Sequence, residues 1–398
     1  MPFTVSLLDA TFVALLGVLA LMRLIWPTRY QLPLVLAGSA VLVSLGSPRT
    51  MVVITGLTLG FIFPLHLLIK RAVDRRWPRV IASSLLPGGL ILLVSLLLFF
   101  KTYNEFAMPW LGSQWITREA LAIVGFSYFI FRAISALRIN AILNTAEPTP
   151  WVMLSYMLFP PTLTSGPIQK YHDFRAQALK PAPLTLPLFY TALYRITRGY
   201  FRKVFLGTIL ASVTPWLLEM PSPTVWVSLA IIVSLYLYFY YDFAGYSDIA
   251  IGFGLLLGIK VPENFKQPFL ATTVSEFWRN WHITLVDFMR EHVYIPLGGM
   301  RGSRRRAAIL SFLIMVLAGL WHGVAVSFVL WGMWYGAWLA YEALAGTGPI
   351  PPTQRRGFRY WCRVLQINAI AAAPSVLFLP DTATMFRVLR GLTNFGFW

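Results

Sequence analysis

Cysteine is almost absent from this 398-residue sequence, which holds a single thiol at Cys362. One cysteine excludes an intrachain disulfide and any cysteine-based metal cluster. Charged residues are also scarce, at 12% of the chain, where a soluble domain carries roughly 25%. Internal repeats and low-complexity linkers are missing too. We therefore predict one membrane domain over residues 1–398, with a motif-bearing core at about 155–340.

Long apolar runs make up most of the sequence. Hydrophobic residues make up 57% of the chain and the mean hydropathy is +0.66. The runs are continuous and do not alternate, which predicts an all-α polytopic membrane protein and not a β-barrel. The first run lacks a basic leader and a small-residue cleavage site, so we expect a retained helix. We predict about eleven crossings from runs at roughly 6–26, 31–46, 51–69, 79–100, 116–137, 150–160, 184–213, 225–242, 246–259, 308–326, 327–345 and 361–380.

Lysine and arginine number 33 against 15 acidic residues, so the formal net charge is +18. In a soluble protein this excess would favour nucleic-acid binding. Here the basic residues lie between apolar runs, where the positive-inside rule explains them as cytoplasmic loops, and no nucleic-acid partner is expected. Lipid headgroups and an acidic protein partner are both compatible with the charge. The clusters are Lys70/Arg71/Arg75/Arg76/Arg79, Arg195/Arg198/Arg202/Lys203, Arg301/Arg304/Arg305/Arg306 and Arg355/Arg356/Arg359/Arg363.

Residues 273–291 have a different pattern, "TVSEFWRNWHITLVDFMRE". Thr273 followed by Glu276 is a capping-box signature for a helix start. Large apolar residues, among them Trp278 and Trp281, fall on one face of a helical wheel and most charges, including that of Glu276, fall on the other. The pattern predicts one amphipathic helix at the interface or along a polar interior. His282 lies at the border of the aromatic stripe, where it would face packed protein.

His322 lies within the apolar run "VLAGLWHGVAV". Sixteen residues separate it from Arg306, so it would lie roughly 24 Å along the helix from the basic loop, past the bilayer midplane. Gly319 and Gly323 flank it and would let a substrate or another helix approach. An ionisable side chain at such a depth is costly and commonly functional. A buried structural imidazole bound to a carbonyl group remains the alternative.

A lone imidazole supports proton transfer better than metal binding. A metal needs three or four ligands, and the run around His322 supplies no Asp, Glu or Cys, so no metal is expected. An apolar site keeps an imidazole neutral and ready to act as a general base. The remaining histidines have ordinary interpretations: interfacial positions for His66 and His172, and a helix C-terminus for His292.

Two further segments carry polar groups among apolar residues. Asp242 and Asp248, in "YYDFAGYSDIAIG", are six residues apart and so on different helix faces; a catalytic pair, interhelical hydrogen bonds, and a cap on a new helix after Gly245 are all open. The Pro- and Gly-broken stretch "FPPTLTSGPIQKYHDF" contains Ser165. Irregular backbone at membrane depth lines cavities, so we expect a cavity wall there.

Four motifs in order, "YYDFAGYSDIAIG", "FWRNWHIT", "YIPLGG" and "GLWHG", resemble the membrane-bound O-acyltransferase (MBOAT) family over about residues 155–340. The resemblance implies a ring of tilted helices around a central tunnel, plus amphipathic helices. It implies catalytic roles for His322, as the base, and His282, which would hold the substrate or an oxyanion. Substrate-binding roles are predicted for Trp278, Asn280, Trp281, Trp321, Asp242 and Ser165.

The resemblance also implies an acyl donor and its partners. No cofactor would stay bound; the donor would be a thioester on a phosphopantetheine arm, carried by coenzyme A or by an acidic carrier protein. That donor would dock on Arg301, Arg304, Arg305 and Arg306 at the cytoplasmic face of the cytoplasmic (inner) membrane. The acceptor would be a hydroxyl of an extracytoplasmic envelope polymer or of an accessory protein.

Different motifs of the sequence resemble different branches of the family. The "FPPTLTSGPIQKY" stretch and the short length resemble the D-alanyl-transferring branch, which we take as the leading prediction. The "YIPLGG" motif before a basic loop resembles the alginate O-acetylating branch. A transporter or channel would also explain a buried histidine and broken helices but predicts inverted repeats. A non-enzymatic scaffold would tolerate the loss of His322.

Overall fold

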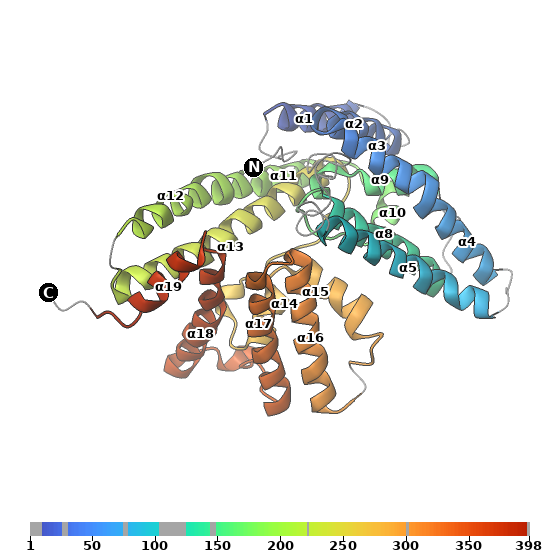
Figure 1. Cartoon of the computed structure of the whole chain (residues 1–398). Helices are drawn as coiled ribbons and strands as arrows, with labels where there is room; N and C mark the ends of the chain where they lie inside the picture. Colours follow the sequence, from blue (N-terminus) through green and yellow to red (C-terminus); the bar gives the residue numbers. More distant parts are fainter. Residues whose placement is uncertain are drawn as a thin grey trace, which may run out of the picture. The chain divides into compact units, whose positions relative to one another are not determined.

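The computed structural model describes residues 10–25, 31–74, 79–102, 125–143, 149–220, 223–299 and 302–395, and these are helical almost throughout (Figure 1). Their one β feature is a bridge between Phe265 and Trp281. The α-helices are α1 (Ala10–Ile25), α2 (Gln31–Gly46), α3 (Pro48–Leu57), α4 (Phe63–Asp74), α5 (Arg79–Thr102), α8 (Phe126–Leu143), α9 (Pro150–Met157), α10 (Tyr171–Leu179), α11 (Leu186–Tyr200), α12 (Gly207–Leu218), α13 (Val225–Leu256), α14 (Val274–Asn280), α15 (Ile283–Met289), α16 (Arg304–His322), α17 (Val326–Ala345), α18 (Gly357–Ala372) and α19 (Thr382–Gly391).

Length and hydropathy identify a multi-pass membrane protein. Within the described part of the chain, five helical segments are long and apolar enough to cross a bilayer. The all-α class is therefore confirmed. The expected run at 116–137 lies partly outside the described residues, and its helix α8 begins at Phe126. The five segments are Pro48–Asp74, Leu186–Leu218, Val225–Leu256, Arg304–His322 and Gly357–Phe378.

The chain forms two compact units. One comprises Met1–Arg198 with Tyr246–Pro262, and the other Gly199–Gly245 with Glu263–Trp398. In the first unit, the buried Arg23 of α1 donates hydrogen bonds to the carbonyl oxygens of Leu255 and Leu256, both at 2.8 Å. The last carbonyl groups of a helix lack intrahelical partners. Arg23 therefore caps the C-terminal end of α13.

Helix α13 corrects one prediction, because the runs at 225–242 and 246–259 form a single helix. Gly245 does not break it. A Cβ at Gly245 would lie 2.7 Å from the backbone nitrogen of Lys203, so the missing side chain lets the segment after α11 pack against α13. Asp248 is consequently in mid-helix, and the alternative that it caps a new helix is wrong.

The second basic cluster also differs from its prediction as a cytoplasmic loop, since it lies inside the continuous helical segment Leu186–Leu218. In the first unit, Arg195 and Arg198 bind the buried Asp248 at 2.8 and 2.6 Å. In the second unit, Lys203 forms an ion pair with Asp242. A carboxylate on an apolar helix is costly unless it is paired, and these cations supply the pairs.

His66 corrects another expectation. It was predicted at an interface, but it is 1% exposed and its Nδ1 lies 3.0 Å from the carbonyl oxygen of Ala136. The carbonyl accepts, so Nδ1 carries the proton. His172, by contrast, is exposed at the start of α10. His66 is thus a packed structural residue.

In the second unit, α16 and α17 form a closely packed antiparallel pair (Figure 1). Glycines permit the approach: a Cβ at Gly319 would collide with the carbonyl oxygen of Phe328, and one at Gly332 would lie 2.5 Å from that of Met315. The expectation that glycines beside His322 let another helix approach is confirmed. The pair positions the end of α16, which carries His322.

We predict that Gly319→Ala destabilises the protein by about 1–3 kcal/mol, the usual cost of overpacking. The added methyl group would force α16 and α17 apart. Gly56→Ala is the matched control, because its Cβ would meet open space in a helix, where alanine stabilises by about 0.5–1 kcal/mol. Thermal unfolding in detergent checks both variants, and a Gly319→Ala transition at or above that of wild type would contradict the packing argument.

Candidate active site

The amphipathic segment is not one helix. Its start is as predicted, since the Thr273 hydroxyl accepts from the backbone N–H of Glu276 at 3.0 Å. The helix α14 ends at Asn280, however, and α15 begins at Ile283. Between them His282 adopts a left-handed conformation with φ 46° and ψ 49°. The prediction of a continuous helix over 273–291 is therefore wrong at the position of greatest interest.

A neighbouring segment compensates the break. The backbone N–H of Lys266 donates to the backbone carbonyl oxygen of Asn280 at 2.9 Å. The backbone N–H of Ile283 donates to the backbone carbonyl oxygen of Asn264 at 3.0 Å. Phe265 forms the antiparallel bridge with Trp281. Buried backbone groups that lose helical partners need others. The hydrophobic pattern of the segment does not reveal this pairing, because the partner lies about 16 residues upstream.

Two buried carboxylates anchor the start of α14. Glu342, from α17, accepts from the backbone N–H groups of Val274 and Ser275 at 2.6 and 2.9 Å. Glu276, predicted on the polar face, is 8% exposed and forms an ion pair with Arg355 at 2.5 Å. Carboxylates are favoured at the N-terminal end of a helix. The break at His282 therefore follows a firmly held helix.

A cavity of about 380 Å³ lies in the second unit. Both His282 and His322 line it, and aromatic rings form most of the remaining wall. Among its described lining residues, Asp242 is the one acidic side chain. The lining comprises Tyr236, Phe239, Asp242, Phe243, Phe277, Trp278, Trp281, His282, His322, Phe328, Trp331, Tyr335, Ala371, Pro374, Ser375 and Phe378.

Hydrogen bonds define the tautomer of His282, which is 3% exposed. Its Nδ1 lies 3.2 Å from Oδ1 of Asn264. The backbone N–H of Thr284 donates to the same Oδ1 at 3.2 Å, and the Thr284 hydroxyl donates at 2.9 Å. A backbone N–H only donates, so the amide atom is an oxygen. Nδ1 must therefore carry the proton that it shares with Asn264.

The second ring nitrogen of His282 is a hydrogen-bond acceptor. Burial, together with the smaller effect of His322, lowers the pKa of His282 well below its ordinary value, so the ring is neutral at pH 7. In a neutral imidazole with a proton on Nδ1, Nε2 presents a lone pair. Within the described residues no hydrogen-bond partner meets Nε2 of His282 or the indole N–H of Trp278. Two residues of the cavity wall thus carry an unused acceptor, Nε2 of His282, and an unused donor, the N–H of Trp278.

His322 occupies a different environment. It is the last residue of α16, and Gly323 is the C-cap of that helix. The His322 side chain is exposed and lines the cavity, so the expectation that it is buried is wrong. Its ring lies 5.3 Å from that of Trp331 in an edge-on contact. Trp321 lies beside both imidazoles, with ring distances of 6.3 Å to His282 and 4.5 Å to His322.

The structure separates the predicted substrate residues into two groups. Trp278, Trp281 and Asp242 line the cavity. Asn280 does not, because its side chain donates back to the carbonyl oxygen of Glu276 at 2.9 Å. Trp321 contacts the imidazoles without belonging to the lining, and Ser165 belongs to the first unit, where it is exposed.

Several lining residues escaped prediction. Tyr236, Phe239 and Phe243 come from one face of α13, at the helical spacing of three and four residues; that periodicity is visible in the sequence but is equally typical of a core. Asn264 was also missed, because one asparagine in a loop carries no signal by itself.

The arginine-rich loop has mixed roles. Arg301 lies outside the described residues. Arg304, Arg305 and Arg306 are exposed at the start of α16. Arg306 also donates to the carbonyl oxygen of Leu297 at 2.6 Å, which holds the preceding turn.

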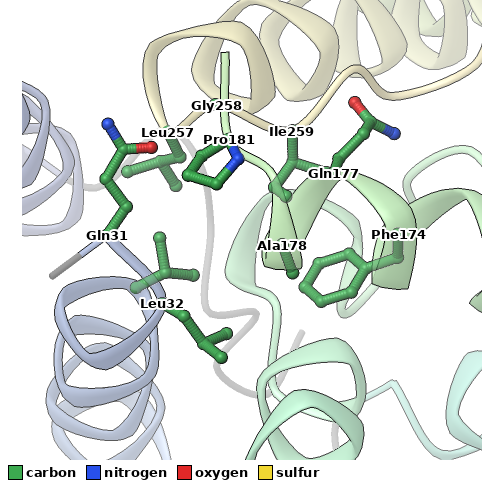
Figure 2. Close-up of a pocket in the computed structure, with 10 residues that line it drawn as sticks. Gln31, Leu32, Phe174, Gln177, Ala178, Pro181, Leu257, Gly258 and Ile259 are labelled. Atoms are coloured by element: carbon green, nitrogen blue, oxygen red, sulfur yellow. The ribbon is translucent and has the colours of Figure 1, made fainter. Parts of the chain in front are cut away.

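A second hollow, in the first unit, is lined by residues of α2, of α10 and of the segment that follows α13 (Figure 2). Its volume is about 10 Å³, no more than one water molecule needs. The described residues also contain no group of three or more His, Cys, Asp or Glu side chains that could hold a metal ion. The aromatic cavity is the candidate site because both imidazoles line it.

A helical membrane protein with two imidazoles at one apolar cavity fits a known class. The family model described as membrane-bound O-acyltransferase matches residues 89–379, and the chain belongs to this family. The resemblance drawn from the four motifs is thus confirmed.

Among the curated relatives are proteins with three different names. A probable alginate O-acetylase of Pseudomonas syringae is 35% identical over 66% of this chain and 52% of its own length. A peptidoglycan O-acetyltransferase of Helicobacter pylori is 32% identical over 62% and 53%. A teichoic acid D-alanyltransferase of Bacillus subtilis is 29% identical over 54% and 57%. The chain spans about half the length of these relatives.

The left-handed backbone of His282 leads to a prediction about substitutions. Asparagine tolerates this conformation, whereas alanine is strained in it by about 1–2 kcal/mol. We expect His282→Asn to unfold near the wild-type temperature and His282→Ala to unfold several degrees lower. Differential scanning fluorimetry in detergent compares the two. Equal transitions for both variants would show that the position carries no backbone strain.

Proposed function

We propose that this protein is an O-acyltransferase that moves an acyl group from a thioester to a hydroxyl group, with the reaction in the aromatic cavity. The observation that carries the proposal is the small set of hydrogen-bonding groups in a cavity wall that is otherwise mostly aromatic. Nε2 of His282 is free to accept a hydrogen bond, the indole N–H of Trp278 is free to donate one, and His322 lines the same cavity. A thioester carbonyl oxygen and an attacking hydroxyl group complement that set.

The chemical roles follow from these positions. His322 takes the proton of the attacking hydroxyl as general base while the oxygen bonds to the thioester carbonyl carbon. The C–S bond then breaks, and His322 returns the proton to the departing thiolate, which leaves as a thiol. His282, neutral and protonated on Nδ1, presents a lone pair and so orients a hydrogen-bond donor of the substrate; in this state it does not donate to an oxyanion from Nε2. The Trp278 N–H donates to the carbonyl oxygen on which charge develops.

The cavity favours an acetyl over a D-alanyl group. A D-alanyl ester carries an ammonium group, which needs an anionic partner when buried. Asp242, the one acidic residue of the described lining, is already paired with Lys203. Higher identity to the relatives named as O-acetylases points the same way. We therefore propose O-acetylation of an envelope polysaccharide or of an accessory protein, with D-alanylation of teichoic acid as the alternative.

The donor side extends the proposal across the cytoplasmic membrane. A phosphopantetheine thioester, on coenzyme A or on an acidic carrier protein, would approach Arg304 and Arg305. These residues precede His322 by 18 and 17 positions on α16, or about 25 Å along the helix. A long flexible arm would bridge that distance. The ring of about eleven crossings around a tunnel, implied by the resemblance, would provide its path.

We predict that His322→Asn lowers transfer by at least about 100-fold, because an amide does not replace a general base. His282→Asn should keep about a tenth of wild-type transfer, since the amide oxygen still accepts a hydrogen bond. The measurement is label transfer from acetyl-coenzyme A to envelope polysaccharide in isolated membranes, normalised to protein level. A D-alanyl thioester is assayed in parallel.

The pattern of loss separates the alternatives. If His282→Asn is as inactive as His322→Asn, the base role belongs to His282 or is shared. Transfer within threefold of wild type for His322→Asn would overturn the base assignment. If label is transferred only from the D-alanyl thioester, the acyl group of the proposal is D-alanyl and not acetyl.

The donor-docking surface gives a separate prediction. Exposed charges mainly affect association rate and its salt dependence. Replacing Arg304 and Arg305 by Gln, while keeping Arg306 for the turn, should weaken donor binding several-fold at low salt and flatten its salt dependence. Arg356→Gln with Arg359→Gln is the matched control, since both side chains are exposed in another cluster. Equal affinity and salt slope for the two double variants would eliminate docking at this loop.

A further inference from the structure

Asn264 lies outside the cavity lining yet contacts the reactive segment twice. It is fully buried, in the loop between α13 and α14. Its backbone carbonyl accepts from Ile283, immediately after His282. Its side-chain oxygen accepts from Thr284 and lies 3.2 Å from Nδ1 of His282. Asn264 thus contacts the ring of His282 through its side chain and the backbone of the next residue, Ile283, through its carbonyl group.

We propose that Asn264 is a positioning residue that fixes His282 as the Nδ1-protonated tautomer, so that Nε2 is the nitrogen available to a ligand. The proposal rests on the proposed function for its catalytic meaning, but the tautomer itself is a property of the unliganded protein. Asn264 acts only through His282 and touches no substrate.

The orientation of the Asn264 amide is determined by Thr284. Two donors from this residue, the backbone N–H and the hydroxyl, converge on Oδ1. An amide flipped by 180° would point its NH₂ group at the Thr284 N–H, placing donor against donor. With the oxygen held there, Nδ1 of His282 faces an acceptor.

The opposite tautomer would be penalised twice. With the proton on Nε2, the lone pair of Nδ1 would face the lone pairs of the Asn264 oxygen. The Nε2 proton would then lie buried in a region where no described residue accepts it. A buried polar group without a partner costs about 1–3 kcal/mol. The observed neighbours therefore favour one tautomer strongly.

Substitution at Asn264 separates this role from simple structural support. The bond from Ile283 goes to the backbone of Asn264, so it survives any change of side chain. Asn264→Asp keeps an acceptor oxygen at Nδ1, whereas Asn264→Ala removes it. Thr284→Val is the matched control, because it removes one hydroxyl donor to Oδ1 and keeps the backbone N–H that orients the amide.

The direct test is ¹⁵N NMR of ring nitrogens in histidine-labelled protein in detergent, with the His282 signals assigned by their loss in His282→Asn. We expect a protonated Nδ1 and an unprotonated Nε2 in the wild type, Asn264→Asp and Thr284→Val. Asn264→Ala should shift the ring toward the Nε2-protonated form. An unchanged tautomer in folded Asn264→Ala, or an Nε2-protonated wild type, would overturn the proposal.

Activity then tests the functional consequence. Asn264→Ala should lower kcat/KM about 10- to 100-fold, the size of effect that follows the loss of residues that orient metal-bound histidines. Asn264→Asp should retain transfer, with the acid limb of its pH profile at higher pH, because a carboxylate at Nδ1 stabilises the imidazolium. His322, Asp242, Tyr236 and Tyr335 also face the cavity and are unchanged in all variants, so they do not produce this shift.

A double-mutant cycle completes the design. If Asn264 acts through His282, Asn264→Ala should add little loss to His282→Asn. Full additivity would indicate a general structural role and refute positioning. The two proposals fail separately: absence of transfer activity in every variant removes the acyltransferase assignment and leaves the NMR result intact, whereas a wrong tautomer removes the positioning role and leaves activity intact.

Discussion

The pairing of residues 264–266 with residues 280–283 is the constraint on which the candidate site depends. It accompanies the end of α14 at Asn280 and supplies hydrogen-bond partners for backbone groups at the break. Without it, the helical pattern of residues 273–291 would continue, and His282 would follow the regular rotation of a helix. The left-handed conformation at His282 is the local consequence of this pairing.

The buried carboxylates of this apolar chain stabilise its fold. Glu342 and Glu276 hold the start of α14, and Asp248 pairs with arginines in the first unit. Each buried carboxylate is compensated by cations or by backbone N–H groups, as the cost of an isolated buried charge requires. Three of the 15 acidic residues therefore have structural roles.

The cavity combines rigid walls with few polar atoms. Aromatic rings from α13, α14, α17 and the segment after α18 surround two imidazoles. Glycines let α16 and α17 approach closely, which brings His322 to the end of a well-packed helix pair. In such a site the few available hydrogen-bonding atoms decide what binds, because each is worth more away from water.

The sequence by itself determined the class of this protein, the choice of His322 and His282 as candidate site residues, and the N-cap of α14 at Thr273. These depend on composition, on short motifs and on local capping, which neighbouring residues encode. Tertiary structure decided the rest. The break at His282 depends on a partner segment upstream, the continuity of α13 through Gly245 depends on a helix packed against it, and the tautomer of His282 depends on Asn264 and Thr284. Such contacts join residues that are distant in sequence or are hidden by a periodicity that continues unbroken, so no local pattern contains them.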